Sequence, residues 1–118
     1  LIFEVATRFP FLVYDTGEDI AGYCYAHPWK SKAAYSQTWE ITIYLAPEHT
    51  GKGIGKALMK QLIEDCRKNG CKVLIADITA ENEGSHERLG FTQVSHFRQV
   101  GRKFGRWLDV IDYQLNLG

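Results

Sequence analysis

The chain has 118 residues, enough for one domain with a single hydrophobic core and near the lower end for an enzyme. Its 14 lysines and arginines balance 14 aspartates and glutamates, so the net charge gives no indication of a nucleic-acid or anionic-membrane partner. No apolar run approaches the length of a membrane span, and hydrophobic and charged contents of 45% and 24% are typical of a globular domain.

The first part of the chain predicts an antiparallel hairpin. The weak pattern of Leu1 to Arg8 predicts the end of a helix, which Pro10 closes. Phe11 to Tyr14 and Ile20 to His27 predict two strands, and the Asp- and Gly-rich stretch Asp15–Asp19 predicts the turn between them. Within the second strand, Gly22 indicates a close approach or a bulge.

A strand, a glycine loop and a helix follow. After a loop from Pro28 to Tyr35, Thr38 to Leu45 predicts a strand because branched and aromatic residues alternate with other residues. The break Ala46–His49 and the glycine loop come next. The apolar residues that then recur at helical spacing are Ile54, Ala57, Leu58, Leu62 and Cys66, and Asn69-Gly70 ends this helix.

The last part predicts three strands and a short helix. Val73 to Ile78 is an apolar run typical of a buried central strand, and Asn82 to Leu89 predicts a helix that ends at Gly90. Phe91 to Val100 and Trp107 to Leu115 predict two more strands, joined by the Gly101–Arg106 loop. The whole order predicts an α/β (α+β) domain over residues 1–118, with helices packed on one mixed sheet.

Three cysteines, Cys24, Cys66 and Cys71, cannot all form disulfides with one another. They form no CxxC motif and lie in apolar stretches, so we expect buried free thiols in a reducing cytoplasm and no metal site.

The glycine loop predicts an anion site. It consists of Thr50, Gly51, Lys52, Gly53, Ile54, Gly55 and Lys56, directly before the helix. Unpaired backbone N–H groups and the helix dipole create positive potential at such a helix start, and glycine lets the backbone approach a diphosphate closely. Lys52 and Lys56 add charge. An ordinary glycine-rich turn with solvated lysines also fits this stretch.

Three phosphate-loop patterns compete for these residues. A Walker loop fails because Thr50 stands where its first glycine belongs and Ala57 where its serine or threonine belongs. A dinucleotide fingerprint starting at Gly53 fails at Leu58. The acyl-coenzyme A loop of the GNAT N-acetyltransferases, Gln/Arg-x-x-Gly-x-Gly/Ala, matches from Gly53 onward and departs at Thr50.

Three further segments extend this match along nearly the whole chain. They are Tyr35-x-x-Thr38-x-Glu40, then Asn82-x-x-Ser85 with His86–Phe91, and finally Val100–Val110. With them, the chain resembles the phosphinothricin and methionine-sulfone branch of the GNAT N-acetyltransferases. The resemblance implies the GNAT fold, a mixed and mostly antiparallel sheet with helices on both faces.

The sequence departs from that branch in two further places. Between Ser85 and His86 the branch usually carries three more residues, nearly one helical turn. The branch also opens with a strand and helices that line the acceptor site, and Leu1 to Arg8 is all that stands there in this sequence. We therefore expect the N-terminal part of the fold to be missing or shortened.

The resemblance implies acetyl-CoA as co-substrate and assigns residues to it. The loop from Thr50 to Lys56 would hold the pyrophosphate. Backbone groups of Ile43, Tyr44 and Leu45 would pair with the pantetheine arm, and an N–H near Leu45 would stabilise the oxyanion. Asn82 and Ser85 match positions that contact the cofactor arm, although both residue types also cap helices.

Through the match Tyr35-x-x-Thr38-x-Glu40, the resemblance implies that Glu40 is the general base, which takes the proton that the acceptor ammonium must lose before it attacks the thioester. A solvated carboxylate or a salt bridge is the alternative for Glu40. Tyr35 is a candidate for the general acid that protonates the leaving thiolate, and Tyr44 is another.

Four residues are candidates for substrate binding. Lys30 and Lys32 fall where this branch often carries arginines that hold the acceptor's acidic group, and ordinary exposed lysines are the alternative. Lys103 and Phe104, with Trp107, lie in the segment that by resemblance reaches across a homodimer interface toward the partner's acceptor site. His86 is expected to be structural.

The sequence therefore leads to a cytoplasmic, acetyl-CoA-dependent N-acetyltransferase for the α-amino group of a small amino-acid analogue. Two alternatives remain at this point. One changes the acceptor to a peptide, a protein amine or a polyamine, and the other is a CoA-binding module without catalysis.

Overall fold

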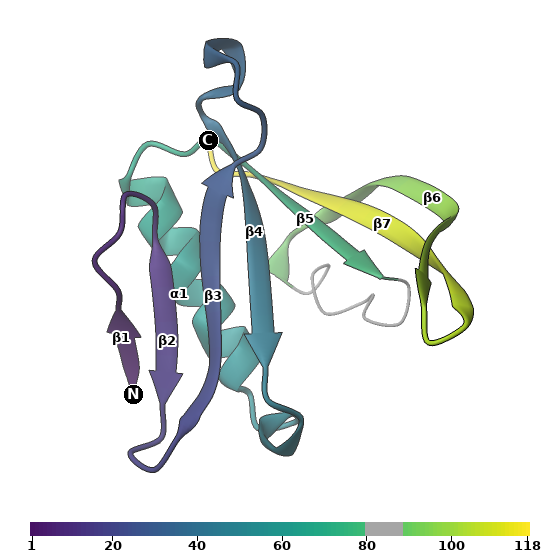
Figure 1. Cartoon of the computed structure of the whole chain (residues 1–118). Helices are drawn as coiled ribbons and strands as arrows, with labels where there is room; N and C mark the ends of the chain where they lie inside the picture. Colours follow the sequence, from purple (N-terminus) through teal and green to yellow (C-terminus); the bar gives the residue numbers. More distant parts are fainter. Residues whose placement is uncertain (80–88) are drawn as a thin grey trace.

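A single mixed sheet forms the body of the protein. The computed structural model describes residues 1–79 and 89–118, and in these ranges the strand order is β1-β2-β3-β4-β5-β7-β6 (Figure 1). The pair β4 and β5 is parallel, and the other neighbouring pairs are antiparallel. The strands are β1 (Ile2–Glu4), β2 (Phe11–Asp15), β3 (Ile20–Pro28), β4 (Thr38–Leu45), β5 (Val73–Thr79), β6 (Thr92–Lys103) and β7 (Arg106–Asn116).

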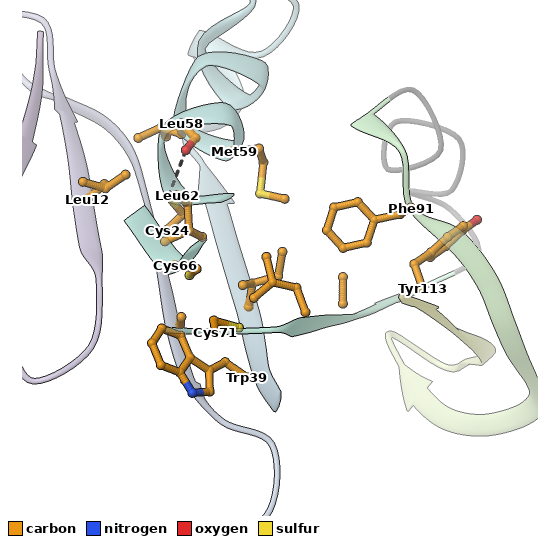
Figure 2. Packing of buried hydrophobic residues seen from close by; sticks show 14 of the residues in the cluster. Leu12, Cys24, Trp39, Leu58, Met59, Leu62, Cys66, Cys71, Phe91 and Tyr113 are labelled. Carbon is orange, nitrogen blue, oxygen red and sulfur yellow. Dashed lines mark hydrogen bonds between the residues drawn. The ribbon is translucent and has the colours of Figure 1, made fainter. Parts of the chain in front are cut away.

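One face of β2, β3 and β4 is covered by α1 (Ile54–Lys68), which lies behind these strands in Figure 1. The helix buries the side chains that recur at its apolar spacing, namely Ile54, Leu58, Met59, Leu62 and Cys66. They meet Leu12, Cys24 and Trp39 from the sheet, and Phe91 and Tyr113 continue the same core beyond β5 (Figure 2). The amphipathic helix and its position after β4 are as predicted.

The predicted second helix, Asn82 to Leu89, falls almost entirely in residues 80–88, outside the described residues. In the described ranges α1 is the only α-helix, so a helix on the opposite face stays a prediction.

The N-terminal segment differs from its prediction. Leu1 to Arg8 was expected to end a helix, but Ile2–Glu4 is a strand paired antiparallel with β2 in the register Phe3↔Val13. A three-residue strand is too short to show a period, and its backbone is fixed by the long-range pairing. The predicted hairpin of β2 and β3 is confirmed, and the Asp15 carboxylate accepts a 2.8 Å hydrogen bond from the Gly17 N–H in its turn.

The hairpin of β6 and β7 is tighter than predicted. The loop expected over Gly101–Arg106 shrinks to Phe104 and Gly105, because β6 runs to Lys103 and β7 starts at Arg106. Phe104 and Gly105 have φ of 51° and 74°, the positive values that a two-residue type I′ turn requires. A phenylalanine in this conformation is uncommon, so residue type gave no indication of it.

All three cysteines are buried and free, as expected. Burial raises the pKa of Cys24 to about 12 and that of Cys71 to about 11, and it raises the pKa of Cys66 as well. The thiols are therefore protonated at neutral pH and act as small core side chains.

Gly22 marks the point where β3 approaches β4 most closely. A Cβ at Gly22 would lie 2.5 Å from the Tyr44 carbonyl oxygen and 2.8 Å from Leu45 Cδ2. Because the first of these is a backbone atom of a paired strand, it cannot move aside without disturbing the sheet. This is the close approach that the sequence indicated.

Gly22→Ala is therefore expected to lower the free energy of unfolding by about 1–3 kcal/mol, as overpacking does. Gly101→Ala is the matched control, because a Cβ there meets nothing closer than 3.7 Å. Chemical denaturation of both variants measures the difference. Equal stabilities for the two variants would contradict the clash.

Candidate functional site

The strands β4 and β5 separate partway along their length. Their register pairs Thr38–Ile41 with Val73–Ala76 and ends at Ile41↔Ala76, whereas β4 continues to Leu45 (Figure 1). Thr42–Leu45 is paired on the other side, with β3. On the β5 side this half of β4 has no paired strand residue in the described part of the chain.

The backbone groups that face this opening belong to Ile43 and Leu45. The Gln37 carbonyl accepts a 3.2 Å hydrogen bond from the Val73 N–H, so odd-numbered residues direct their backbone groups toward β5. Backbone groups alternate between the two edges of a strand. The N–H and C=O groups of Ile43 and Leu45 are therefore directed into the opening, where an extended ligand could pair with them.

The glycine loop lies at the end of this opening. Gly51 and Gly53 have φ of 79° and 80°, and open space surrounds the position of a Cβ at each. Gly53 is the N-cap of α1, and the Ala57 N–H makes the first helical bond to its carbonyl (3.1 Å). A Cβ at Gly55 would lie 2.9 Å from Leu45 Cδ1, so the first turn of α1 is packed against the end of β4.

This helix start has the properties of an anion site. No side chain caps it, and its first turn contains no acidic residue. The N–H groups of Ile54, Gly55 and Lys56 precede the first helical bond, so they have no partner within α1. Lys52 and Lys56 are exposed beside them. The backbone conformation of the loop, the open space around its glycines and its positive charge therefore all suit a bound diphosphate.

One of these lysines is held by a neighbouring turn. Lys52 Nζ lies 3.3 Å from His49 Nδ1, and His49 Nε2 lies 3.2 Å from the Asp19 carboxylate. Hydrogen bonds from Thr16 and His49 lower the pKa of Asp19, so it is ionised at neutral pH. The Thr50 hydroxyl donates a 2.9 Å hydrogen bond to the Pro47 carbonyl. Thr50 therefore does not take over the role of the glutamine or arginine that the acyl-coenzyme A loop carries at this position.

Ligand atoms of Asp19, Glu48 and His49 lie within 4.8 Å of one another. His49 already contacts Lys52 there, and nothing else in the described ranges indicates a metal.

Glu40 lies on the sheet face opposite α1, together with Thr42 and Tyr44. Its Oε1 is 3.3 Å from Nε2 of His27 on β3, and the two side chains are 22% and 41% exposed. On the same face Tyr23 stacks on Tyr44, with ring centroids 5.4 Å apart. The salt-bridge alternative for Glu40 is thus present in the structure. A carboxylate this exposed can also accept a proton from a bound ligand.

Two aspartates that the sequence reasoning missed lie on the same sheet face as Glu40. Asp77 on β5 pairs in register with Asp112 on β7. Partial burial, then the Asp77 carboxyl, raises the pKa of Asp112 to about 6, although Ser95 opposes the shift. Partial burial and the Glu40 carboxylate raise the pKa of Asp77. In the sequence, each aspartate stands within an apolar run that predicts a strand, and this was the available signal. Only the strand register shows that Asp77 and Asp112 lie opposite each other.

Tyr35 and the two candidate lysines lie in the loop before β4. Tyr35 ends a short 3₁₀ turn (Ala33–Tyr35), and its ring makes an edge contact with Trp29 at 5.7 Å. Lys30 lies over the Trp29 ring at 4.9 Å, and Lys32 is exposed. No hydrogen bond joins Tyr35 to Glu40 within the described residues. The roles of all three side chains stay predictions.

Lys103 and Phe104 lie at the tip of the β6–β7 hairpin. Lys103 Nζ is 5.4 Å from the centre of the Phe104 ring, which is 86% exposed. The hairpin projects from the body of the sheet (Figure 1). It exposes further large apolar side chains, namely Val94, Phe97, Val100 and Trp107.

The remaining predicted cofactor contacts, Asn82 and Ser85, lie in residues 80–88 and so outside the described residues. The same holds for His86.

Residues 2–91 match the model of the acetyltransferase (GNAT) family. The chain is 38% identical to the L-amino acid N-acyltransferase MnaT of Escherichia coli and 39% identical to a methionine sulfoximine/methionine sulfone acetyltransferase of Salmonella typhimurium. These matches cover 98% and 92% of this chain, and 70% and 66% of the relatives. A phosphinothricin N-acetyltransferase of Alcaligenes faecalis is 36% identical over 92% of this chain and 58% of its own length.

Solved structures show the same fold. An acetyltransferase of Salmonella typhimurium with acetyl-CoA superimposes with a TM-score of 0.88 at 38% identity, over 94% of this chain and 66% of that one. A phosphinothricin acetyltransferase of Sinorhizobium meliloti in complex with acetyl-CoA gives a TM-score of 0.87 at 38% identity, over 93% and 62%. The predicted fold class is confirmed. The chain spans about two thirds or less of the length of most of these relatives.

Proposed function

The chain belongs to the acetyltransferase (GNAT) family, and on that premise we propose that it is an acetyl-CoA-dependent N-acetyltransferase. Its acceptor in this proposal is the α-amino group of a small amino-acid analogue of the methionine sulfone or phosphinothricin type. One observation carries the proposal: the opening between β4 and β5 begins beside Glu40 and ends at the glycine loop. Relatives that act on such analogues support the acceptor class.

The residues of the opening fit acetyl-CoA. The amides of residues 51–56, with Lys52 and Lys56, would hold the pyrophosphate, because the glycines leave room and the first turn of α1 contains no acidic residue. The backbone groups of Ile43 and Leu45 would pair with the pantetheine arm as a neighbouring strand would. This places the thioester end toward Glu40. When bound, acetyl-CoA supplies the acetyl group in activated form.

The chain's own groups would then perform two tasks. Glu40 takes a proton from the acceptor ammonium, which frees the nitrogen lone pair for attack. A backbone N–H on the opening side of β4 would donate a hydrogen bond to the thioester oxygen as negative charge develops there, a type of contact worth roughly 3–4 kcal/mol in the transition state. Tyr35 or Tyr44 would return a proton to the leaving thiolate.

The acceptor approaches from the sheet face opposite α1, where the Glu40 side chain lies. Lys30 and Lys32, in the loop that leads into β4, would attract its acidic group. Lysine keeps the charge of arginine but lacks its two-pronged carboxylate geometry, so we expect weaker acceptor binding than an arginine pair gives.

Two measurements test this function. Isothermal titration with acetyl-CoA measures cofactor binding, and a thiol-release assay measures turnover across amino-acid analogues, a peptide and a polyamine. Turnover with methionine sulfone or phosphinothricin supports the proposal. Turnover with the peptide or polyamine alone would move the acceptor to those classes, and binding without turnover would leave a CoA-binding module.

We further propose that the chain forms a homodimer through the β6–β7 hairpin in the cytoplasm. The exposed Phe97, Val100, Phe104 and Trp107 support a protein interface, since large apolar side chains gather on this arm. The three buried free thiols suit a reducing compartment. No helix in the described ranges could cross a membrane. Sedimentation at the mass of one chain at all concentrations would contradict the dimer.

A further inference from the structure

A row of polar side chains crosses the sheet from β3 to β6 on the face that carries Glu40. The strand registers place His27 opposite Glu40, Asp77 opposite Asp112, and Asp112 opposite Ser95. Glu40 pairs in register with Ile75, two residues before Asp77 on the same face of β5. Three neighbouring strands, β4, β5 and β7, thus contribute one carboxyl group each to a row that starts at the opening between β4 and β5.

These groups are linked in sequence. His27 Nε2 lies 3.3 Å from Glu40 Oε1, and the Ser95 hydroxyl donates a 2.8 Å hydrogen bond to Asp112 Oδ2. Between them, Asp77 lies directly opposite Asp112 in the strand register and on the same sheet face as Glu40, and both carboxyl groups act on the pKa of Asp77. An ionised carboxylate only accepts hydrogen bonds, so two carboxyl groups can bond only if one of them holds a proton. Neighbouring carboxyl groups favour a shared proton, because two adjacent negative charges repel each other.

The electrostatic surroundings agree with this geometry. The titratable groups that face Asp77 are Asp112 from β7, Glu40 from β4 and His27 from β3. Partial burial and the Asp77 carboxyl raise the pKa of Asp112 to about 6. Near neutral pH the two aspartates are thus close to the point where one shared proton is lost, and they titrate as a pair.

We propose that Asp77 and Asp112 form a proton relay next to Glu40. They are positioning residues that act through Glu40, because this pair of carboxyl groups receives the proton that Glu40 removes from the acceptor. This inference rests on the proposed function. The N–H bond of the ammonium breaks as Glu40 gains an O–H bond. That O–H bond then breaks as the Asp77 carboxylate takes the proton, and Asp77, which is exposed, releases it to water. Glu40 is thereby ready to accept the next proton.

The shared proton is tested without any assay of activity. Carbon-13 NMR of the aspartate carboxyls against pH is expected to show Asp112 titrating near pH 6. Asp77→Asn removes the neighbouring carboxyl, so the Asp112 midpoint should fall, although partial burial, the larger cause of the shift, keeps it above the ordinary aspartate value. Glu18→Gln, a loss of charge in the distant β2–β3 turn, should leave the Asp112 midpoint in place. If no aspartate titrates above pH 5, or if Asp77→Asn leaves the Asp112 midpoint unmoved, the shared proton is disproved.

The link to Glu40 is tested by the pH profile of kcat/KM. Asp77→Asn is expected to lower kcat by about tenfold, which is a smaller loss than removal of the general base itself usually causes. The affinity for acetyl-CoA should stay unchanged. Asp112→Asn replaces the carboxyl group that lowers the pKa of Asp77 with a weaker hydrogen-bond donor, so the acid limb should move to higher pH. A loss by the same factor at every pH in both variants would indicate a structural role and overturn the relay.

The two proposals fail in distinguishable ways. If no acceptor is acetylated, the proposed function fails and the relay fails with it, whatever the carboxyl titration shows. If acetylation proceeds with the wild-type pH profile in both aspartate variants, the function stands and the relay alone is overturned.

Discussion

Replacing Glu40 with glutamine is expected to lower kcat by about a hundredfold or more and to leave acetyl-CoA affinity unchanged. Glutamine keeps the size of the side chain but cannot accept a proton from the acceptor ammonium. The fold should survive, because the ion pair with His27 is partly exposed and such pairs contribute little to stability. Steady-state kinetics and isothermal titration on the same preparation measure the two quantities.

His27→Ala is the informative companion variant. It removes the partner of Glu40 but leaves the carboxylate, so most of the turnover should remain. If Glu40→Gln weakened acetyl-CoA binding as much as it lowered kcat, or if His27→Ala lost as much activity as Glu40→Gln, Glu40 would be a structural residue and not the base.

Gly53→Ala is expected to weaken acetyl-CoA binding by more than tenfold. Gly53 has a φ of 80°, which costs a residue with a Cβ about 1–2 kcal/mol and re-aims the amides at the start of α1. Gly17→Ala is a matched control, because Gly17 has a φ of 95° and the same open surroundings but lies in the β2–β3 turn. Both variants should lose similar stability, as thermal unfolding would show.

Isothermal titration separates the two glycines. Only Gly53→Ala should raise the dissociation constant of acetyl-CoA. Similar dissociation constants for both variants and the wild type would mean that the loop amides do not hold the pyrophosphate.

Local pattern was sufficient to predict most of the sheet and the helix. β4 has the bounds that its alternating residues predicted, and α1 buries the side chains chosen by helical spacing. The errors fall where long-range pairing decides the structure. Ile2–Glu4 becomes a strand only because β2 lies beside it, and Phe104 takes a positive φ because the β6–β7 register closes there.

The candidate site was predicted only in part for the same reason. Glu40 and the glycine loop stand in short motifs that a sequence displays directly. Asp77 and Asp112 are separated by more than thirty positions in the chain and meet only through the pairing of β5 with β7. The sequence shows an aspartate in each of these apolar runs, but it does not show that the two aspartates are neighbours in the sheet.

The proposed function depends above all on a diphosphate that binds the main-chain amides between residues 51 and 56. NMR of the nitrogen-15-labelled chain during titration with coenzyme A tests it most directly. We expect the amide signals of Ile43 and Leu45 to shift together with those of the loop, while the signal of Gly17 stays in place; the loop signals are those of Gly51, Gly53, Ile54, Gly55 and Lys56. Saturable shifts that leave these loop signals unmoved, or no shifts at all, would contradict it.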